Sequence, residues 1–471
     1  MPVEFNRYFA THAWIHGAWA RDVLLTVDDA GHWHDIAVAA PPLARSGATM
    51  LDGPVLPALV NAHSHAFQRA IAGLTECRGA GASDDFWSWR DRMYSVARRI
   101  SPEQLESIAA FLYAELLAGG YTQVCEFHYL HHAADGEPHA DPLDMSLALV
   151  RAAQRVGMGL TLLPTLYMHS GFGVQGLQAG QRRFAGTPDS VMRLLQDVQR
   201  QTRGLAGINV GLAIHSLRAV DAASLHEVAA EAARMAVPVH IHIAEQTQEV
   251  QDCLAYTAQR PIEWLLDKMQ LDARWNLVHA THTNAAELQG VQDSGAAIVI
   301  CPSTEANLGD GVFDYSGYAR LGGRWSIGSD SHVTRGWTEE LRLLEYSQRL
   351  TQRRRNVAAQ ADNSASSAAA LFQAALSGGR SATSKPLGAI ESGNRADFLV
   401  LDRSSPALLG VPAENLLDAL VFSSPGTPFA HMYVAGNQVM ASGEIVGSGS
   451  GPSSWGAVKN DFAETMQCLW R

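Results

Sequence analysis

Short apolar runs alternate with longer amphipathic segments between about residues 55 and 380. Eight runs have the length of a buried strand: Val55–Val60, Gln123–Phe127, Leu160–Pro164, Ile208–Ile214, Val237–Ile243, Asn276–Ala280, Ala296–Cys301 and Trp325–Ser329. The intervening segments have helical periodicity, as in Glu103–Ala118, Leu143–Val156, Ser190–Thr202 and Ala222–Met235. Neighbouring parallel strands need a crossover between them, and a helix is its usual form. The pattern therefore predicts a (β/α)8 barrel over residues 56–385.

Strand-like patterns also occur at both ends of the chain. They are Ala13–Ile15, Asp22–Val27, Ala396–Leu401 and Met432–Gly436. We expect residues 1–55 and 386–471 to pair into one small β-sandwich domain beside the barrel. Ala358–Ser367, rich in Ala, Ser and Asn, is predicted to be a loop before one last barrel helix. Gly447–Ser454 is predicted to link the small domain to a terminal helix.

The overall charge limits the partners of this chain of 471 residues. Its formal net charge is −12, which argues against non-specific binding to nucleic acid but allows an anionic substrate held by a few local Arg residues. Its five cysteines are scattered without zinc-finger or redox spacing, so we expect a reducing compartment. No apolar run is long enough to cross a bilayer, and the first residues lack the pattern of a signal peptide. We therefore expect a cytoplasmic protein that does not enter membranes.

Two histidines follow the first apolar run, in Asn61-Ala62-His63-Ser64-His65. Side chains alternate along a strand, so His63 and His65 point the same way, toward the mouth of the predicted barrel. Two imidazoles with this spacing form half of a site for zinc or a similar ion. Taken alone, the pattern is weak, because it more often marks two polar histidines at a strand end.

Three further runs also end in ionisable residues. The fifth ends in His240-Ile241-His242 and is followed by Glu245, the sixth ends at His279, and the eighth leads to Asp330. His242 is favoured as a ligand over His240 because it lies nearer the rim. The carboxyl ends of parallel strands meet at one edge, so these residues predict a joint site with His63, His65, His242 and Asp330 as metal ligands.

This constellation resembles the amidohydrolase superfamily over nearly the whole chain, and Gly388–Leu401 resembles the return into that family's small domain. Many members hold two metals bridged by a carboxylated Lys on the fourth strand. The segment Ile208–Arg218 contains no Lys, which resembles the one-metal subgroup that deaminates C–N bonds. The resemblance implies one divalent ion per chain, zinc in the first place, although iron and manganese accept similar ligands. It also implies a homodimer.

Three longer stretches of sequence make the family resemblance more specific. They are His63–Ala70 with Gly73–Glu76, Glu126–His132 and Cys301–Gly311. They resemble the branch of the superfamily that hydrolyses N-formimino-L-glutamate to N-formyl-L-glutamate and ammonia in histidine degradation. The expected mechanism assigns Asp330 to the metal and its water, Glu245 to proton transfer and His279 to polarising the attacked group.

A dianionic substrate needs local cations in an acidic protein. Arg90, in the loop expected after the first strand, and His215 and Arg218, after the fourth, are the candidates for gripping its carboxylates. Gln68 and Tyr129 are further candidates for hydrogen bonds to the substrate, whereas His131-His132 is predicted to be a polar loop. An Arg near a loop end is often only solvated or salt-bridged.

Two alternatives remain open. One is a related deaminase or chlorohydrolase for a heterocycle such as guanine or a triazine, which would not need this cationic set. The other is a barrel without catalysis that serves as an interaction protein.

Overall fold

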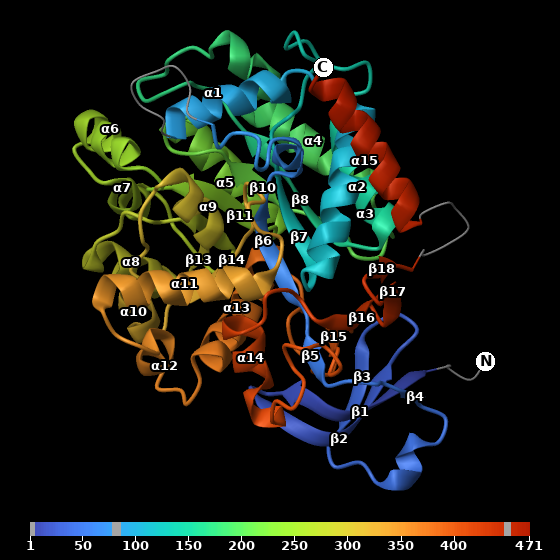
Figure 1. Ribbon diagram of the computed structural model, residues 1–471. Coiled ribbons are helices and arrows are strands. Elements are labelled where there is room, and N and C mark those ends of the chain that lie inside the picture. Colours follow the sequence, from blue (N-terminus) through green and yellow to red (C-terminus); the bar gives the residue numbers. More distant parts are fainter. Residues whose placement is uncertain (1–4, 78–85, 447–453) are drawn as a thin grey trace.

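The computed structural model describes residues 5–77, 86–446 and 454–471. The described chain contains two separate sheets, seen in Figure 1 as a helix-covered barrel above a smaller sheet near the amino terminus. The barrel sheet runs in the order β14-β13-β12-β11-β10-β8-β7-β6, and all of its pairings are parallel. A parallel bridge between Ser64 and Asp330 brings its first and last strands together. The predicted (β/α)8 barrel is confirmed.

The barrel strands are short and buried, as expected for a parallel sheet covered by helices. They are β6 (Leu59–Ser64), β7 (Tyr121–His128), β8 (Gly159–Leu166), β9 (Ile208–Val210), β10 (Leu212–Ile214), β11 (Val239–Ile243), β12 (Trp275–His279), β13 (Ala297–Ile300) and β14 (Arg324–Ile327).

Two predicted strands differ from the structure. The run Val55–Val60, expected to be one strand, divides at Ala58: β5 (Val55–Pro57) joins the smaller sheet, and β6 begins the barrel at Leu59. The fourth run is interrupted at Gly211, where a Cβ would lie 2.8 Å from the Pro238 oxygen. The chain there passes from β9, which pairs only with β8, to β10, which also pairs with β11.

The helices around the barrel begin where the sequence supplies capping groups. Ser101 and Gln104 form a capping box at α2, and Asp221 caps α5. The four example helices of the sequence analysis are confirmed to within two residues as α2 to α5. The helices are α1 (Phe86–Ala97), α2 (Pro102–Ala118), α3 (Asp144–Val156), α4 (Pro188–Gln201), α5 (Ala222–Met235), α6 (Thr247–Thr257), α7 (Pro261–Lys268), α8 (Ala285–Ser294), α9 (Pro302–Leu308), α10 (Tyr315–Arg320), α11 (Trp337–Gln352), α12 (Val357–Ala361), α13 (Ser367–Thr383), α14 (Leu416–Phe422) and α15 (Trp455–Leu469).

Helix α12 lies in the segment that we predicted to be a loop. The buried carboxylate of Glu345, on α11, accepts hydrogen bonds from the backbone N–H groups of Val357 (2.8 Å) and Ala358 (2.9 Å). These are N–H groups of the first turn, which have no partner inside a helix. A contact from a distant helix thus stabilises a turn that the local sequence does not predict.

The second sheet combines both ends of the chain (Figure 1). Strand β5 is central to it, because it pairs with β1 in parallel and with β15 in antiparallel register. Its other strands are β1 (Asn6–Ile15), β2 (Ala18–Val27), β3 (Trp33–Ala37), β4 (Thr49–Met50), β15 (Phe398–Leu401), β16 (Phe429–Val434), β17 (Asn437–Ala441) and β18 (Glu444–Ile445). The expected domain boundaries at residues 55/56 and 385/386 stay predictions. All but the last residue of the predicted linker Gly447–Ser454 lies outside the described residues.

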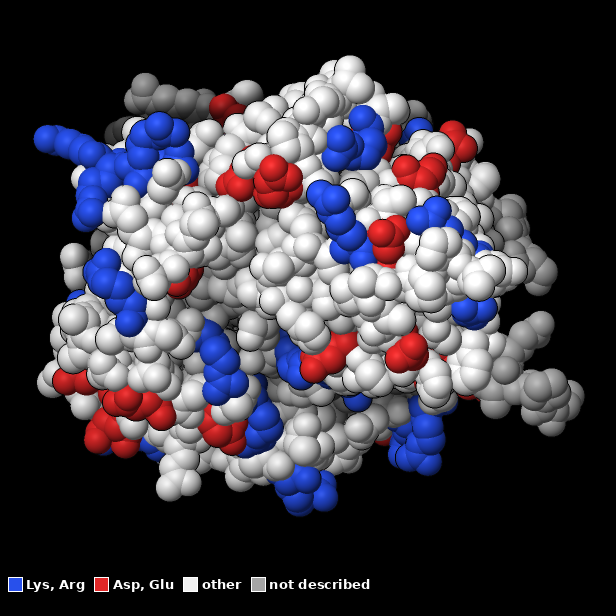
Figure 2. All heavy atoms as spheres, turned by 90° about the horizontal axis from the view of Figure 1, so that it is seen from below, with Lys and Arg blue, Asp and Glu red and all other residues white. Residues whose placement is uncertain are grey.

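Charged side chains of both signs lie on the surface of the described chain. On the face shown in Figure 2, acidic and basic side chains are scattered among larger uncharged areas of the described surface. None of the described helices combines the length and the hydropathy that crossing a bilayer requires.

Helix α13 packs closely against the barrel through two glycines. A Cβ on Gly378 would lie 1.8 Å from the Trp325 oxygen of β14, and one on Gly379 would lie 2.9 Å from the Val60 Cβ. These are contacts that real Cβ atoms do not make, so a larger residue must push the helix away. The glycines allow the end of α13 to approach the barrel strands.

We expect Gly378→Ala to lower the free energy of unfolding by about 1–3 kcal/mol, because overpacking outweighs the better helix propensity of Ala. Thermal unfolding monitored by circular dichroism measures the effect. Gly456→Ala, in α15, is the control, since its Cβ would meet nothing closer than the Ser454 hydroxyl at 3.8 Å. Equal or higher stability of Gly378→Ala would show that α13 can move without penalty.

Candidate metal centre and substrate pocket

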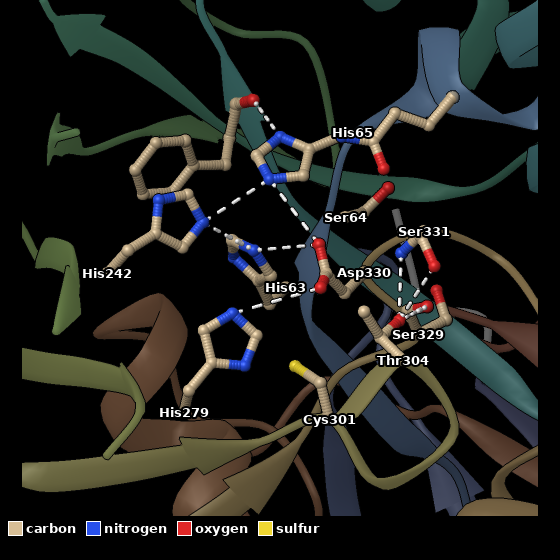
Figure 3. A network of polar contacts seen from close by, with 12 residues as sticks. His63, Ser64, His65, His242, His279, Cys301, Thr304, Ser329, Asp330 and Ser331 are labelled. Carbon is tan, nitrogen blue, oxygen red and sulfur yellow. Dashed lines mark hydrogen bonds and ion pairs between the residues drawn. The ribbon is translucent and has the colours of Figure 1, made fainter. Parts of the chain in front are cut away.

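Three imidazoles and one carboxylate converge at the carboxyl ends of the barrel strands (Figure 3). The Nε2 atom of His242 lies 3.0 Å from Nε2 of His63 and 3.3 Å from Nε2 of His65. The Asp330 Oδ1 atom lies 3.3 Å from His63 Nε2 and 3.5 Å from His65 Nε2. All four side chains are buried. The structure thus brings together the four residues that the sequence predicts as ligands.

The closure of the barrel positions three of these residues. The backbone N–H of Asp330 donates to the His63 carbonyl (3.0 Å), and the N–H of His65 donates to the Asp330 carbonyl (3.3 Å). His63 lies inside β6, while His65 and Asp330 lie just beyond β6 and β14. Asp330 has a φ of +44°, in the left-handed region that is unfavourable for residues other than glycine. Such local strain is common where a functional side chain must point into a site.

The protonation of the rings shows that the cluster fits a cation. His65 Nδ1 donates to the Phe127 carbonyl (2.9 Å), and His242 Nδ1 donates to the His215 carbonyl (3.0 Å), because a carbonyl can only accept. Burial is the largest influence on both rings and lowers their pKa values, so they are neutral. Their Nε2 atoms therefore carry lone pairs that face each other. A positive ion between these lone pairs and the Asp330 carboxylate would make this arrangement favourable.

His279 and Glu245 lie beside this cluster. His279 Nε2 is 3.6 Å from Glu245 Oε1 and 3.8 Å from Asp330 Oδ2. Burial lowers the pKa of His279, but the nearby carboxylates, Glu245 foremost, outweigh it and raise the pKa to about 10. Burial raises the pKa of Glu245 to about 7. The His279 ring also lies close enough to His63 and His242 to be a ligand, so its assigned role as a polarising group stays a prediction.

Cys301 also approaches the cluster, with its sulfur within reach of His279 and Asp330. Burial raises the pKa of its thiol well above the usual value. A protonated thiol is a poor ligand, because metals bind the thiolate. The chemistry of the donor atoms therefore favours the imidazoles and Asp330.

A pocket opens directly above the cluster, with an empty volume of about 460 Å³. This value includes space that is open to solvent. All five residues that the sequence analysis proposed for substrate binding line it, namely Gln68, Arg90, Tyr129, His215 and Arg218. The lining also contains Phe86, Trp89, Met93, Tyr94 and Leu308, which sequence reasoning missed.

The two arginines of this pocket have unused hydrogen-bonding capacity. Among the described residues, Arg90 Nε and Arg218 Nη1 are buried without a hydrogen-bond partner. Arg90 is held by its stacking on aromatic rings, with its guanidinium carbon 4.5 Å from the Trp87 ring centroid. It lies on helix α1, not in the loop that we predicted after the first strand. Buried cationic donors without protein partners are suited to binding an anion.

Three buried carboxylates around the rim were also missed. Glu126 accepts from the Ser64 hydroxyl (2.7 Å) and the Ala66 N–H (2.6 Å), on either side of His65. Glu249 accepts from the N–H groups of Ala244 (3.2 Å) and Glu245 (3.1 Å). Glu305 lies 3.3 Å from His279 Nδ1. They hold the backbone or the rings that carry the proposed chemistry.

No sequence signal marks these three carboxylates, although Glu126 and Glu305 lie in two of the runs that carry the family resemblance. Other histidines are placed elsewhere. His240 contacts the Ala382 carbonyl through Nε2 (2.8 Å), and His131 and His132 contact the Thr165 and Ala185 carbonyls. These three residues therefore lie outside the cluster of His63, His65, His242 and Asp330.

Comparisons of sequence and of structure with known proteins point to the same family. The model of the amidohydrolase family matches residues 55–439. A formimidoylglutamate deiminase of Pseudomonas aeruginosa is 46% identical over 439 residues, covering 93% of this chain and 95% of the relative. The crystal structure of an amidohydrolase from Brucella melitensis, 39% identical, superposes with a TM-score of 0.91 over 99% of this chain and 100% of the other. A zinc-bound adenosine deaminase from Xanthomonas campestris shares the fold, with 20% identity and a TM-score of 0.80 over 98% of each chain.

Proposed function

The chain belongs to the amidohydrolase family, and from this premise we propose that it is a metal-dependent deiminase acting on N-formimino-L-glutamate. The reaction consumes water and yields N-formyl-L-glutamate and ammonia. The observation that carries the choice of substrate is the pair Arg90 and Arg218, two guanidinium groups with unpartnered nitrogens beside the metal cluster. The similarity to the Pseudomonas deiminase supports the same assignment.

We propose His63, His65, His242 and Asp330 as ligands of one divalent ion, with zinc as its identity. Such an ion supplies Lewis acidity, which lowers the pKa of water toward neutrality and polarises the attacked group. His65 and His242 are oriented for this role by the carbonyls that hold their Nδ1 atoms.

Glu245 and His279 then act on the substrate. Glu245 lines the pocket, and its raised pKa of about 7 allows it to take a proton from the attacking water and give it to the departing nitrogen. His279 orients and polarises the formimino group, and Glu305 keeps its ring in place. Attack by water on the formimino carbon breaks the bond to nitrogen, so ammonia leaves. No covalent bond to the protein forms.

We extend the proposal to the cellular context. A cytoplasmic location is supported by the five cysteines, all of which are free. A homodimer is supported by the family resemblance alone.

The direct test is ammonia release from N-formimino-L-glutamate, measured beside guanine and a triazine under the same conditions. We expect turnover of the formimino compound only. A preference for either heterocycle would instead support the deaminase or chlorohydrolase alternative, and inactivity toward all three would support a barrel without catalysis.

Arg218→Met tests whether Arg218 binds a carboxylate of the substrate. The variant loses a charge-assisted hydrogen bond of about 1.5–3 kcal/mol, so kcat/KM for formiminoglutamate should fall by about 10- to 100-fold. The metal content should not change, because Arg218 is not a ligand.

Two further measurements sharpen this prediction. Two substrates that each lack one carboxylate are N-formimino-4-aminobutyrate and N-formimino-L-norvaline. With the wild type, their kcat/KM should be lower than that of formiminoglutamate by a similar factor. One of these two substrates lacks the carboxylate that Arg218 would bind. For that substrate, kcat/KM should fall much less when Arg218 is replaced by Met. Arg193→Met, at an exposed site on α4, is the matched control. Normal turnover by both Arg218→Met and Arg90→Met would refute a dianionic substrate.

A further inference from the structure

A second pocket lies next to the substrate pocket and shares one residue with it. Its empty volume is about 520 Å³, including space that is open to solvent. The lining comes from the segment after β8, the segment from Leu217 to Ala222, and helices α6 and α7. The residue in the lining of both pockets is Arg218.

The chemistry of this second pocket is mainly apolar and aromatic. Phe172, Tyr256 and Trp264 contribute rings, and Phe172 and Tyr256 face each other with centroids 5.8 Å apart. Leu217 and Val220 contribute aliphatic groups. Tyr256 is 60% exposed, so the pocket reaches the surface beside α6.

Two polar groups in the lining, His169 and Asp221, lie close to each other. His169 Nε2 lies 3.5 Å from Asp221 Oδ2, and Asp221 also accepts from the N–H and hydroxyl of Ser224 at the start of α5. Among the described residues, Arg218 Nη1, like His169 Nε2, is buried without a hydrogen-bond partner, but the guanidinium of Arg218 is always charged. Its contact with the ring of Trp87, at 5.9 Å, is long.

We propose that this second pocket binds an aromatic carboxylate, with its ring among Phe172, Tyr256 and Trp264 and its carboxylate on Arg218. A cation with unused donors favours a carboxylate, and the surrounding rings favour an aromatic group. A ligand placed in this way engages the arginine that the substrate also needs. The pocket is therefore an inhibitory site, and its effect on turnover rests on the proposed role of Arg218.

3-Phenylpropionate is the probe, with the uncharged 3-phenylpropionamide and the ringless propionate as its matched controls. Calorimetry on the purified protein measures binding, and ammonia release measures inhibition. We expect 3-phenylpropionate to bind at least about tenfold more tightly than either control, because each lacks one of the two contacts. We also expect it to raise the KM for formiminoglutamate.

The variants Tyr256→Ala and Trp264→Leu locate the site. Each should weaken probe binding at least about fivefold while leaving KM and kcat without the probe unchanged. Tyr346→Ala removes an exposed ring outside the pocket and should have no effect. Unchanged binding in both pocket variants would place the probe in the substrate pocket and overturn the proposal, as would the absence of binding at millimolar concentration.

Failure of this inference is separable from failure of the proposed function. Calorimetric binding needs no turnover, so the probe can bind as expected even if formiminoglutamate is not a substrate. Conversely, ammonia release without probe binding would leave the proposed function intact and refute only the second site.

Discussion

Replacing His63 or Asp330 with Ala is expected to abolish both metal binding and hydrolysis. The wild type should hold about one divalent ion per chain. Each substitution removes an atom that lies 3.0–3.5 Å from its neighbours in the cluster, and only three of the four proposed ligands would remain to hold the ion. Elemental analysis measures metal content, and ammonia release measures activity.

His240→Asn is the matched control for the ligand variants. His240 lies two residues before His242 on the same strand, but its ring contacts the Ala382 carbonyl. Asn keeps a donor for that carbonyl, so the variant should retain its metal. Circular dichroism of all three variants identifies any that fail to fold. Two tightly bound ions in fully active protein, or full metal content in folded His63→Ala, would contradict the ligand set.

Glu245→Gln should lower kcat by about 10²-fold or more while the metal stays bound. Gln keeps the shape and the hydrogen-bonding capacity of the side chain but cannot carry a proton between the water and the leaving nitrogen. The expectation depends on Glu245 lining the pocket without being one of the proposed ligands. Steady-state kinetics and elemental analysis on the same preparation measure the two quantities.

Glu227→Gln, at an exposed position on α5, should leave kcat unchanged and controls for the loss of one acidic charge. A Glu245→Gln protein that loses its metal would show that Glu245 is a ligand. Near-normal turnover would show that the proton is carried by another group.

The gathering of the proposed metal ligands could be predicted because it depends on a general property of parallel strands. Their carboxyl ends meet at one edge, so residues that follow different strands must converge. His63, Asp330 and His242 illustrate this, since they are distant in sequence and meet within a few ångströms. The pattern of apolar runs was sufficient to place them.

Other features depend on contacts that the local sequence does not contain. The run Val55–Val60 divides between two sheets because β5 has pairing partners from both ends of the chain. Helix α12 forms where Glu345 supplies its N-terminal hydrogen bonds. Glu305 becomes important only because its helix brings it to His279. Each case requires the tertiary arrangement to be known first.

The position of β5 has a consequence for the synthesis of the chain. β5 is complete at Pro57, but its neighbour β15 begins only at Phe398, about 340 residues later. At about 5–20 residues per second, a ribosome needs roughly 17–70 s to make the intervening segment. During this time one edge of β5 has no partner strand, and an unpaired edge invites association with other chains. Newly made molecules are therefore expected to need protection by chaperones until the carboxyl-terminal strands emerge.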